Sequence, residues 1–189
     1  MFLEAEQVAI SAGVKISQRH LAATAGALNY PSMRYEMVRC GIGLYGLNPW
    51  DDREYSQYQL KPAMRAVAQV VNLKRVLAGQ GVSYGYRYRT NQETTLALVP
   101  FGYSEGMPRI AVGAKVLIAG KLFEISGRVA MDQFVVDVGD HDVALGSEVV
   151  IFGDPANGEP SAEALGESAG TINYEIVTRI GGRAKRVYL

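Results

Sequence analysis

The sequence predicts a mainly β domain, an antiparallel sandwich or barrel with two helices at its end, preceded by a piece of an α/β domain. From residue 60 onward the apolar runs are short and β-prone, and Gly, Asn and Asp separate them at intervals of about ten residues. No helical pattern lies between these runs, which is unlike a parallel sheet. Before residue 60 the pattern is helix, strand, helix, strand, the order of an α/β unit.

The α/β pattern occupies the opening third. Apolar residues at helical spacing predict a helix over residues 1–12, ended by Gly13. Residues 14–16 alternate as a strand does, the small and polar residues 20–29 complete the second helix before Pro31, and residues 35–46 form an apolar strand interrupted by glycines. Two such units cannot close a barrel or a sheet. We therefore expect further sequence upstream of the first residue.

A polar, proline-containing connector at residues 48–52 precedes the β-prone runs. Strands are expected at residues 66–76, 94–99, 115–119, 122–125, 133–138 and 148–152.

Two helices are expected after the last strand. Ser161 is the N-cap of the first, and Thr171 begins the second. Residues 181–182, both glycine, stop the second helix. Its apolar stripe consists of Ile172, Ile176 and Ile180.

Composition excludes several classes of protein. Lys plus Arg number 19 and so do Asp plus Glu, so no positive field is available to hold nucleic acid. The single cysteine, Cys40, allows neither an internal disulfide nor a zinc site built from cysteines. No apolar run approaches the ~18 residues of a membrane span, and the first residues lack the basic start of a signal peptide. We expect a cytoplasmic protein with no membrane, nucleic-acid or metal partner.

Four motifs carry side chains suited to chemistry. Residues 81–85 (GVSYG) and 101–106 (FGYSEG) each set a tyrosine among small residues beside a strand, which alone is typical of a turn. Residues 127–133 (GRVAMDQ) join two apolar strands. Residues 171–175 (TINYE) put Tyr174 in the first turn of a helix, where free N–H groups favour an anion.

In this order the four motifs resemble those of the alanine racemase family: SYG, GY-S/A-x-G with Arg109 just beyond it, GR-x-x-MDQ, and TINYE. Residues 20–26 resemble the family's H-x-A-N-S/T-A-A segment, and residues 38–47 its V-R-x-G-I-x-x-Y-G-L strand. The departures are mild: Ala23 stands where the family has Asn, and Ala130 precedes the methionine of the MDQ motif.

The resemblance implies a (β/α) barrel of eight strands that binds pyridoxal 5'-phosphate (PLP), followed by a mainly β domain. Residues 1–58 would be the last barrel units and residues 59–189 the β domain. It also implies a head-to-tail homodimer whose active sites each join one subunit's barrel to the other's β domain. The implied reaction is the PLP-dependent interconversion of L-alanine and D-alanine, which supplies D-alanine for peptidoglycan.

Racemisation removes the α-proton on one face and returns it on the other, so two bases are needed. The resemblance assigns one base to the lysine that holds PLP, which has no match in this chain, and the other to Tyr84. A phenol is a poor base at neutral pH, and lowering its pKa by about three units requires roughly 4 kcal/mol from nearby cations. The resemblance puts the Met131 N–H on the substrate carboxylate. It puts Arg39 beside the PLP ring nitrogen, which stays largely unprotonated because arginine keeps its own proton.

The remaining roles are also implied by the resemblance. Backbone and hydroxyl groups would hold the PLP phosphate, namely those of Thr24, Gly41, Ile42 and Tyr174. His20 would support this loop rather than act in catalysis. The substrate entrance would be lined by Tyr103 and Tyr174 and, further out, by Arg109, Arg128 and Ile172. A narrow entrance favours alanine over bulky amino acids, because overpacking is costly.

Four other interpretations stay open. The chain could be a non-catalytic β domain or dimerisation module, or part of a broad-specificity amino-acid racemase. A decarboxylase of the same barrel type is disfavoured by the SYG, MDQ and TINYE motifs together. A nucleic-acid-binding barrel is disfavoured because no basic run interleaves with the aromatic residues. Since the family's PLP lysine, one arginine and one histidine have no match in the chain, we expect the chain alone to be inactive.

Overall fold

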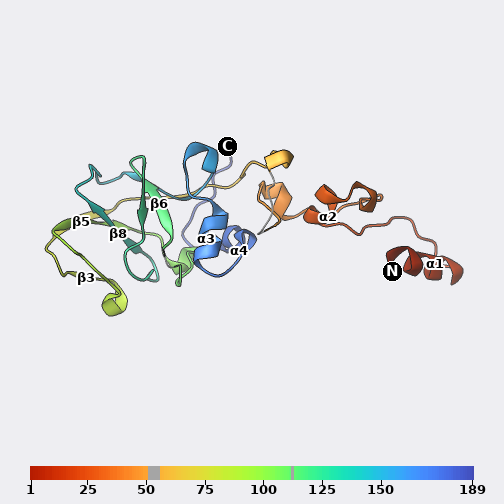
Figure 1. Ribbon diagram of the computed structural model, residues 1–189, viewed down its shortest axis with the longest axis horizontal. Coiled ribbons are helices and arrows are strands. Elements are labelled where there is room, and N and C mark those ends of the chain that lie inside the picture. The colour runs from red at the N-terminus through yellow and green to blue at the C-terminus, as the bar shows by residue number, and fades with distance from the viewer. Residues whose placement is uncertain (51–55, 112) are drawn as a thin grey trace. The chain divides into compact units, whose positions relative to one another are not determined.

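The computed structural model describes residues 1–50, 56–111 and 113–189 of the chain. It divides into two compact units, an N-terminal unit of Met1–Leu60 and a β unit of Lys61–Leu189. The β unit contains antiparallel sheets followed by two helices (Figure 1), as the sequence predicted for the larger part of the chain.

The N-terminal unit is built from short helices. These are α1 (Phe2–Ser11), α2 (Thr24–Asn29) and the 3-10 turns η1 (Pro31–Met33), η2 (Ile42–Tyr45) and η3 (Ser56–Tyr58). The α1 helix confirms the prediction for residues 1–12, and Gly13 follows it with φ +81°. The second predicted helix is confined to α2. Of the predicted connector, Asp51 and Asp52 lie outside the described residues.

Both strands predicted in this unit are wrong. Residues 14–16 form no ladder, and residues 42–45 wind into η2, which ends at Gly46 in the left-handed region. Glycines favour such a turn over a strand, because they adopt conformations closed to other residues and offer no side chain to pack. Among the described residues of the unit, strand pairing is limited to one parallel bridge between Ala23 and Arg39.

The β unit holds two main sheets and a ribbon. One sheet has the order β1-β9-β6-β7, formed by Ala66–Gln69, Glu148–Phe152, Lys115–Ile118 and Lys121–Glu124. The other has the order β2-β5-β8, formed by Asn72–Val76, Thr94–Val99 and Phe134–Gly139. The ribbon pairs β3 (Gly81–Val82) with β4 (Tyr88–Arg89). Neighbouring strands in all three are antiparallel. The ribbon was not predicted, since each of its strands has two residues.

The run predicted as one strand over residues 66–76 changes sheets at its centre. The Val70 N–H donates to the Ser147 carbonyl at 2.9 Å, whereas the Val71 N–H donates to the Leu98 carbonyl at 3.0 Å. On the opposite side, a bridge between Ile125 and Val136 connects the end of β7 to β8. The seven strands therefore follow one another around a circuit, which is the barrel alternative of the predicted fold class.

The core of the β unit follows the strand period. Along β8 the side chains alternate between buried and half-buried, as expected for a strand with one face on the core. Each large apolar side chain so buried contributes roughly 1.5–3 kcal/mol. The largest apolar side chains with less than 2% exposure include Phe134, Phe152, Ile118, Ile151 and Ile176.

The two helices are α3 (Ala162–Ser168) and α4 (Asn173–Arg179), which pack against each other (Figure 1). The Ser161 hydroxyl accepts the Ala164 N–H at 3.0 Å, so the predicted N-cap is confirmed. The helix was predicted to begin at Thr171, two residues before the observed start of α4 at Asn173. Its N-cap is Ile172, because the Thr171 hydroxyl donates to the Glu175 side chain instead of capping the backbone. Ile172 is 51% exposed, so the predicted stripe is reduced to its other two isoleucines.

No helix in the described ranges is long and apolar enough to cross a membrane.

Candidate active site

Tyr84 lies on a strained turn between β3 and β4. Ser83 (φ +57°), Gly85 (φ +73°) and Tyr86 (φ +43°) all adopt left-handed backbone conformations. Such conformations cost about 1–3 kcal/mol at non-glycine residues and persist only when their surroundings hold them. The turn projects from the sheets (Figure 1), and the Tyr84 side chain is 69% exposed.

A contact with residues 127–133 holds this turn. The Ser83 hydroxyl donates to the Arg128 carbonyl oxygen at 2.6 Å. A Cβ placed on Gly85 would lie 3.6 Å from Nη1 of Arg128, so this guanidinium lies directly beside the tyrosine turn. The structure thus brings two of the predicted site residues, Tyr84 and Arg128, onto neighbouring loops.

The loops 101–106 and 127–133 leave the same end of the second sheet. The first follows β5 and the second precedes β8, and Val99 is paired with Phe134 where these strands meet. Backbone hydrogen bonds then join the loops: Tyr103 N–H to the Ala130 carbonyl at 3.1 Å, and Ser104 N–H to the Met131 carbonyl at 2.9 Å.

Gly102 makes this close approach possible. A Cβ at this position would lie 2.1 Å from the Met131 carbonyl oxygen and 2.5 Å from that of Ala130. Only glycine fits there without moving one of the two backbones. Tyr103 and Met131 are consequently held in a fixed relation, and their side chains are 41% and 55% exposed.

The Met131 N–H is free to bind a ligand. It donates no hydrogen bond within the described parts of the chain, although its neighbours Ala130 and Gln133 bond to one another. An exposed, unpaired N–H at a fixed position is a donor for an anion such as a carboxylate.

Sequence reasoning missed a carboxylate that anchors these loops. Glu105 is 2% exposed and accepts the Gly102 N–H at 2.8 Å, the Ser104 hydroxyl at 2.8 Å and Nε of Arg183 at 2.7 Å. The Arg183 hydrogen bond, with help from the Gly102 N–H, lowers the pKa of Glu105 to about 2. Arg183 also reaches the Asp132 carbonyl at 3.0 Å. Since Glu105 and Arg183 are 78 residues apart, no local pattern pointed to the pair.

The remaining predicted residues of this unit are placed as follows. Arg109 is exposed beyond the 101–106 loop. Tyr174 lies in the first turn of α4, and the exposed Ile172 caps that helix. The end of α4 packs on the loop, since a Cβ on Gly106 would lie 2.4 Å from the Arg179 carbonyl oxygen.

The N-terminal unit gathers a second group of predicted residues. The Thr24 hydroxyl oxygen accepts the N–H groups of Gly41 at 3.2 Å and Gly43 at 3.3 Å. A Cβ on Gly43 would lie 2.6 Å from Cγ2 of Thr24, so the backbone fits tightly over this buried side chain. Because both bonds are accepted, the Thr24 hydroxyl proton is available for a further acceptor. The Ile42 N–H donates to no described residue.

Arg39 is held by His20 in this unit. Its Nη1 lies 2.8 Å from Nδ1 of His20 and donates to the His20 carbonyl at 3.0 Å. Arginine is always a donor, so Nδ1 must accept and the imidazole carries its proton on Nε2. His20 thus positions a guanidinium, in line with the supporting role predicted for it.

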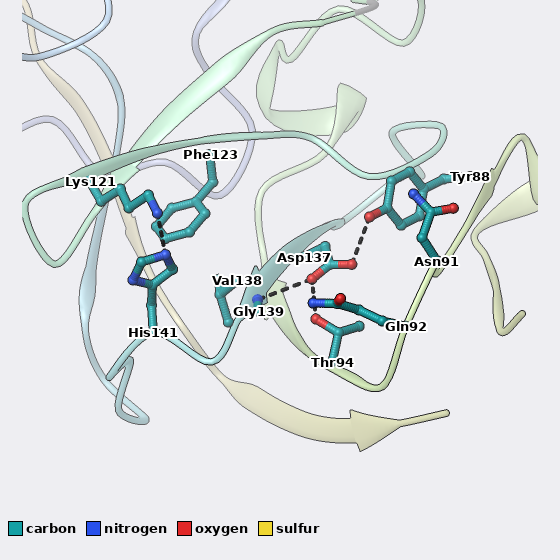
Figure 2. Close-up of a pocket in the computed structure, with 10 residues that line it drawn as sticks. All are labelled: Tyr88, Asn91, Gln92, Thr94, Lys121, Phe123, Asp137, Val138, Gly139 and His141. Carbon is teal, nitrogen blue, oxygen red and sulfur yellow. Dashed lines mark hydrogen bonds between the residues drawn. The ribbon is translucent and has the colours of Figure 1, made fainter. Parts of the chain in front are cut away.

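A separate cavity of about 410 Å³ lies in the β unit and contains none of the motif tyrosines. Figure 2 shows that Asp137 and Lys121 each have partners among the residues that line the cavity. Asp137 accepts hydrogen bonds from Tyr88 at 2.6 Å, from Thr94 and from the Gly139 N–H, and Lys121 contacts His141. We therefore assign this cavity no part in the candidate site.

No cluster able to hold a metal ion occurs among the residues that the structure describes.

Comparison with known proteins identifies the relatives of the chain. The family described as "Alanine racemase, C-terminal domain" matches residues 63–188, and "Alanine racemase, N-terminal domain" matches residues 1–49. Proteins named alanine racemase from Thermobifida fusca and Frankia casuarinae are 48% and 47% identical, over 99% and 100% of the chain. A crystal structure of alanine racemase from D-cycloserine-producing Streptomyces lavendulae covers the whole chain with a TM-score of 0.96 and 47% identity. The chain spans about half the length of each of these relatives.

Proposed function

The chain belongs to the alanine racemase family, and on that basis we propose that the complete polypeptide containing it interconverts L-alanine and D-alanine in a PLP-dependent reaction. One observation carries this proposal beyond family membership. The Tyr84 phenol is exposed on a strained turn, and that turn is tied to the loop that presents the free Met131 N–H.

In this proposal Tyr84 is one of the two proton-transfer groups. Its hydroxyl donates to no described residue, so its proton can be exchanged with a substrate carbon. The rigid turn keeps the phenol in place, which matters because proton transfer requires heavy atoms within about 2.6–3.2 Å. The Arg128 guanidinium lies beside the same turn, 3.6 Å from where a Cβ on Gly85 would stand.

The Met131 N–H binds the substrate carboxylate. The donor is a backbone group, so it depends on the loop pairing at Gly102 and not on the methionine side chain. Tyr103 and Tyr174 narrow the entrance, with Arg109, Arg128 and Ile172 further out. These assignments rest on the family motifs.

The N-terminal unit offers hydrogen-bond donors that suit a phosphate, and it offers the Arg39 guanidinium, which suits an acceptor nitrogen. Its free donors are the Ile42 N–H and the Thr24 hydroxyl proton, while the Gly41 N–H is already given to Thr24. We propose that Ile42, Thr24 and Tyr174 hold the PLP phosphate together with Gly41, whose N–H would exchange its bond to Thr24 for one to the phosphate. We further propose that Arg39 faces the ring nitrogen. Bound PLP would supply the electron sink that makes the α-proton removable. Because arginine is a hydrogen-bond donor only, Arg39 would leave the ring nitrogen of bound PLP largely unprotonated.

We further propose the assembly that the family resemblance implies. Residues 1–58 are the last units of the PLP barrel and residues 59–189 the β domain. In a head-to-tail homodimer, each active site then combines the barrel of one subunit with the β domain of the other. The enzyme is cytoplasmic and supplies D-alanine for peptidoglycan.

The test is a racemisation assay with L-alanine and PLP in which D-alanine is measured by a D-amino-acid oxidase coupled reaction. The complete polypeptide should form D-alanine, and the chain of 189 residues alone should not, since the family resemblance implies that the PLP lysine lies outside it. In the complete polypeptide, Tyr84→Phe should lower turnover at least 10²-fold, the usual contribution of one acid–base group, while PLP absorbance is retained.

Three results would count against the proposal. Turnover by the chain alone would show that no upstream lysine is needed. Full activity of Tyr84→Phe would remove Tyr84 from the mechanism. Equal turnover of larger amino acids would replace alanine racemisation by the broad-specificity alternative.

A further inference from the structure

We propose that Glu105 and Arg183 form a clamp that sets the affinity for the substrate carboxylate by fixing Tyr103 and Met131. The inference rests on the proposed function, because it assigns positioning residues to the same site. Neither residue belongs to the tyrosine, methionine and arginine set that the motifs select.

Glu105 is a buried carboxylate whose negative charge is satisfied by specific partners. A carboxylate that is 2% exposed is costly to bury, and it is retained only where partners satisfy it. The partners here all lie at the site. They are the Gly102 N–H that begins the 101–106 loop, the Ser104 hydroxyl and the Arg183 guanidinium.

Arg183 carries the connection to the second loop. One nitrogen binds Glu105 at 2.7 Å, and another donates to the Asp132 carbonyl at 3.0 Å, directly after Met131. The Ser104 hydroxyl also reaches the Asp132 side chain at 2.9 Å. A single arginine therefore spans both loops that present the proposed substrate contacts.

The segment that carries Arg183 is itself fixed to the first loop. The Gly181 N–H donates to the Glu105 carbonyl at 3.1 Å, and a Cβ on Gly182 would lie 2.5 Å from the Ser104 carbonyl oxygen. The end of α4 and the residues after it are thus closely packed on residues 104–105. This packing fixes the backbone that precedes Arg183, whose side chain is 58% exposed.

The consequence is specific to substrate binding. Without the clamp, the Met131 N–H and the Tyr103 ring are positioned only by the backbone hydrogen bonds between their loops, whereas Tyr84 is still held through Ser83 and Arg128. We expect Glu105→Gln in the complete polypeptide to raise KM for alanine about tenfold and to change kcat less than threefold. A group that only stabilised the fold would change the amount of active enzyme and leave KM unaltered.

The chain offers a matched control in Glu159→Gln. The Glu159 side chain is 8% exposed, binds Nε of Arg65 at 2.6 Å and accepts the Asp154 N–H at 2.8 Å. It is therefore a buried, arginine-paired carboxylate in the same unit, remote in sequence from both loops. Glu159→Gln should lower the melting temperature about as much as Glu105→Gln does, and it should leave KM unchanged. Arg183→Lys keeps a charge for Glu105 but loses the planar fork that spans two acceptors, and should give an intermediate KM.

A second measurement does not depend on activity. Hydrogen exchange followed by mass spectrometry should show the backbone amides of residues 101–106 exchanging at least tenfold faster in Glu105→Gln, and unaltered in Glu159→Gln. An unchanged KM, or equal exchange in the two variants, overturns the clamp. If the unmodified polypeptide does not racemise alanine, the proposed function fails, and the exchange result still decides whether the clamp exists.

Discussion

Replacing Gly102 by alanine tests the close pairing of the two site loops. The added Cβ would lie 2.1 Å from the Met131 carbonyl oxygen, so one backbone has to move by more than about 1 Å to reach an ordinary contact distance. Overpacking of this kind costs about 1–3 kcal/mol. The shift also weakens the hydrogen bonds from Tyr103 to Ala130 and from Ser104 to Met131, at about 0.5–1.5 kcal/mol each.

The two effects together predict a loss of roughly 2–6 kcal/mol in the free energy of unfolding of the chain. Urea unfolding followed by circular dichroism measures this loss. Gly181→Ala is the control, because its nearest contact to an added Cβ is 3.9 Å and its φ lies outside the left-handed region. We expect it to change stability by less than about 0.5 kcal/mol. If the free energies of unfolding of the two variants differ by less than about 1 kcal/mol, the two loops do not approach each other this closely at Gly102.

Two further predictions concern other parts of the β unit. Burial, and after it the hydrogen bond to the Asp137 carboxylate, raises the pKa of Tyr88 to about 12, above its ordinary value of 10.0. The stability gained from the neutral phenol is therefore complete below pH 10 and lost as the pH rises through about 12. Ultraviolet titration should show one tyrosine that ionises only near pH 12. Asp137→Asn should move this transition to lower pH, and Tyr88→Phe should abolish it. Persistence of the transition in Tyr88→Phe would contradict the assignment. Ser161→Ala should lower the free energy of unfolding by about 1 kcal/mol, because the α3 cap is lost. Ser161→Thr should retain most of the stability that the cap provides. Equal stability of both variants and the unmodified protein would exclude the cap.

The sequence predicted the features that depend on local pattern. The strands β5 and β9 and the Ser161 cap were expected where they occur, because alternation, turn residues and capping are short-range signals. The division of residues 66–76 between two sheets was not foreseen, because the partners of Val70 and Val71 lie far along the chain.

The candidate site shows the same limit. Its motif residues were recognised as a family pattern, but the Glu105–Arg183 pair had no local signal, since a carboxylate in a turn is usually solvated. The strand expected over residues 35–46 failed for a related reason. Its apolar residues suggest a strand, yet among the described residues of its own unit no ladder is present to satisfy its backbone, and the glycines allow a tighter turn.

The change of sheet between Val70 and Val71 couples the unfolding of the two sheets. β1 and β2 are each the outermost strand of their own sheet, and they are consecutive along one backbone. Because the two edge strands share one backbone, local unfolding of one sheet at this edge also disturbs the other sheet. We therefore expect the slowest-exchanging backbone amides of both sheets to belong to one cooperative folding unit.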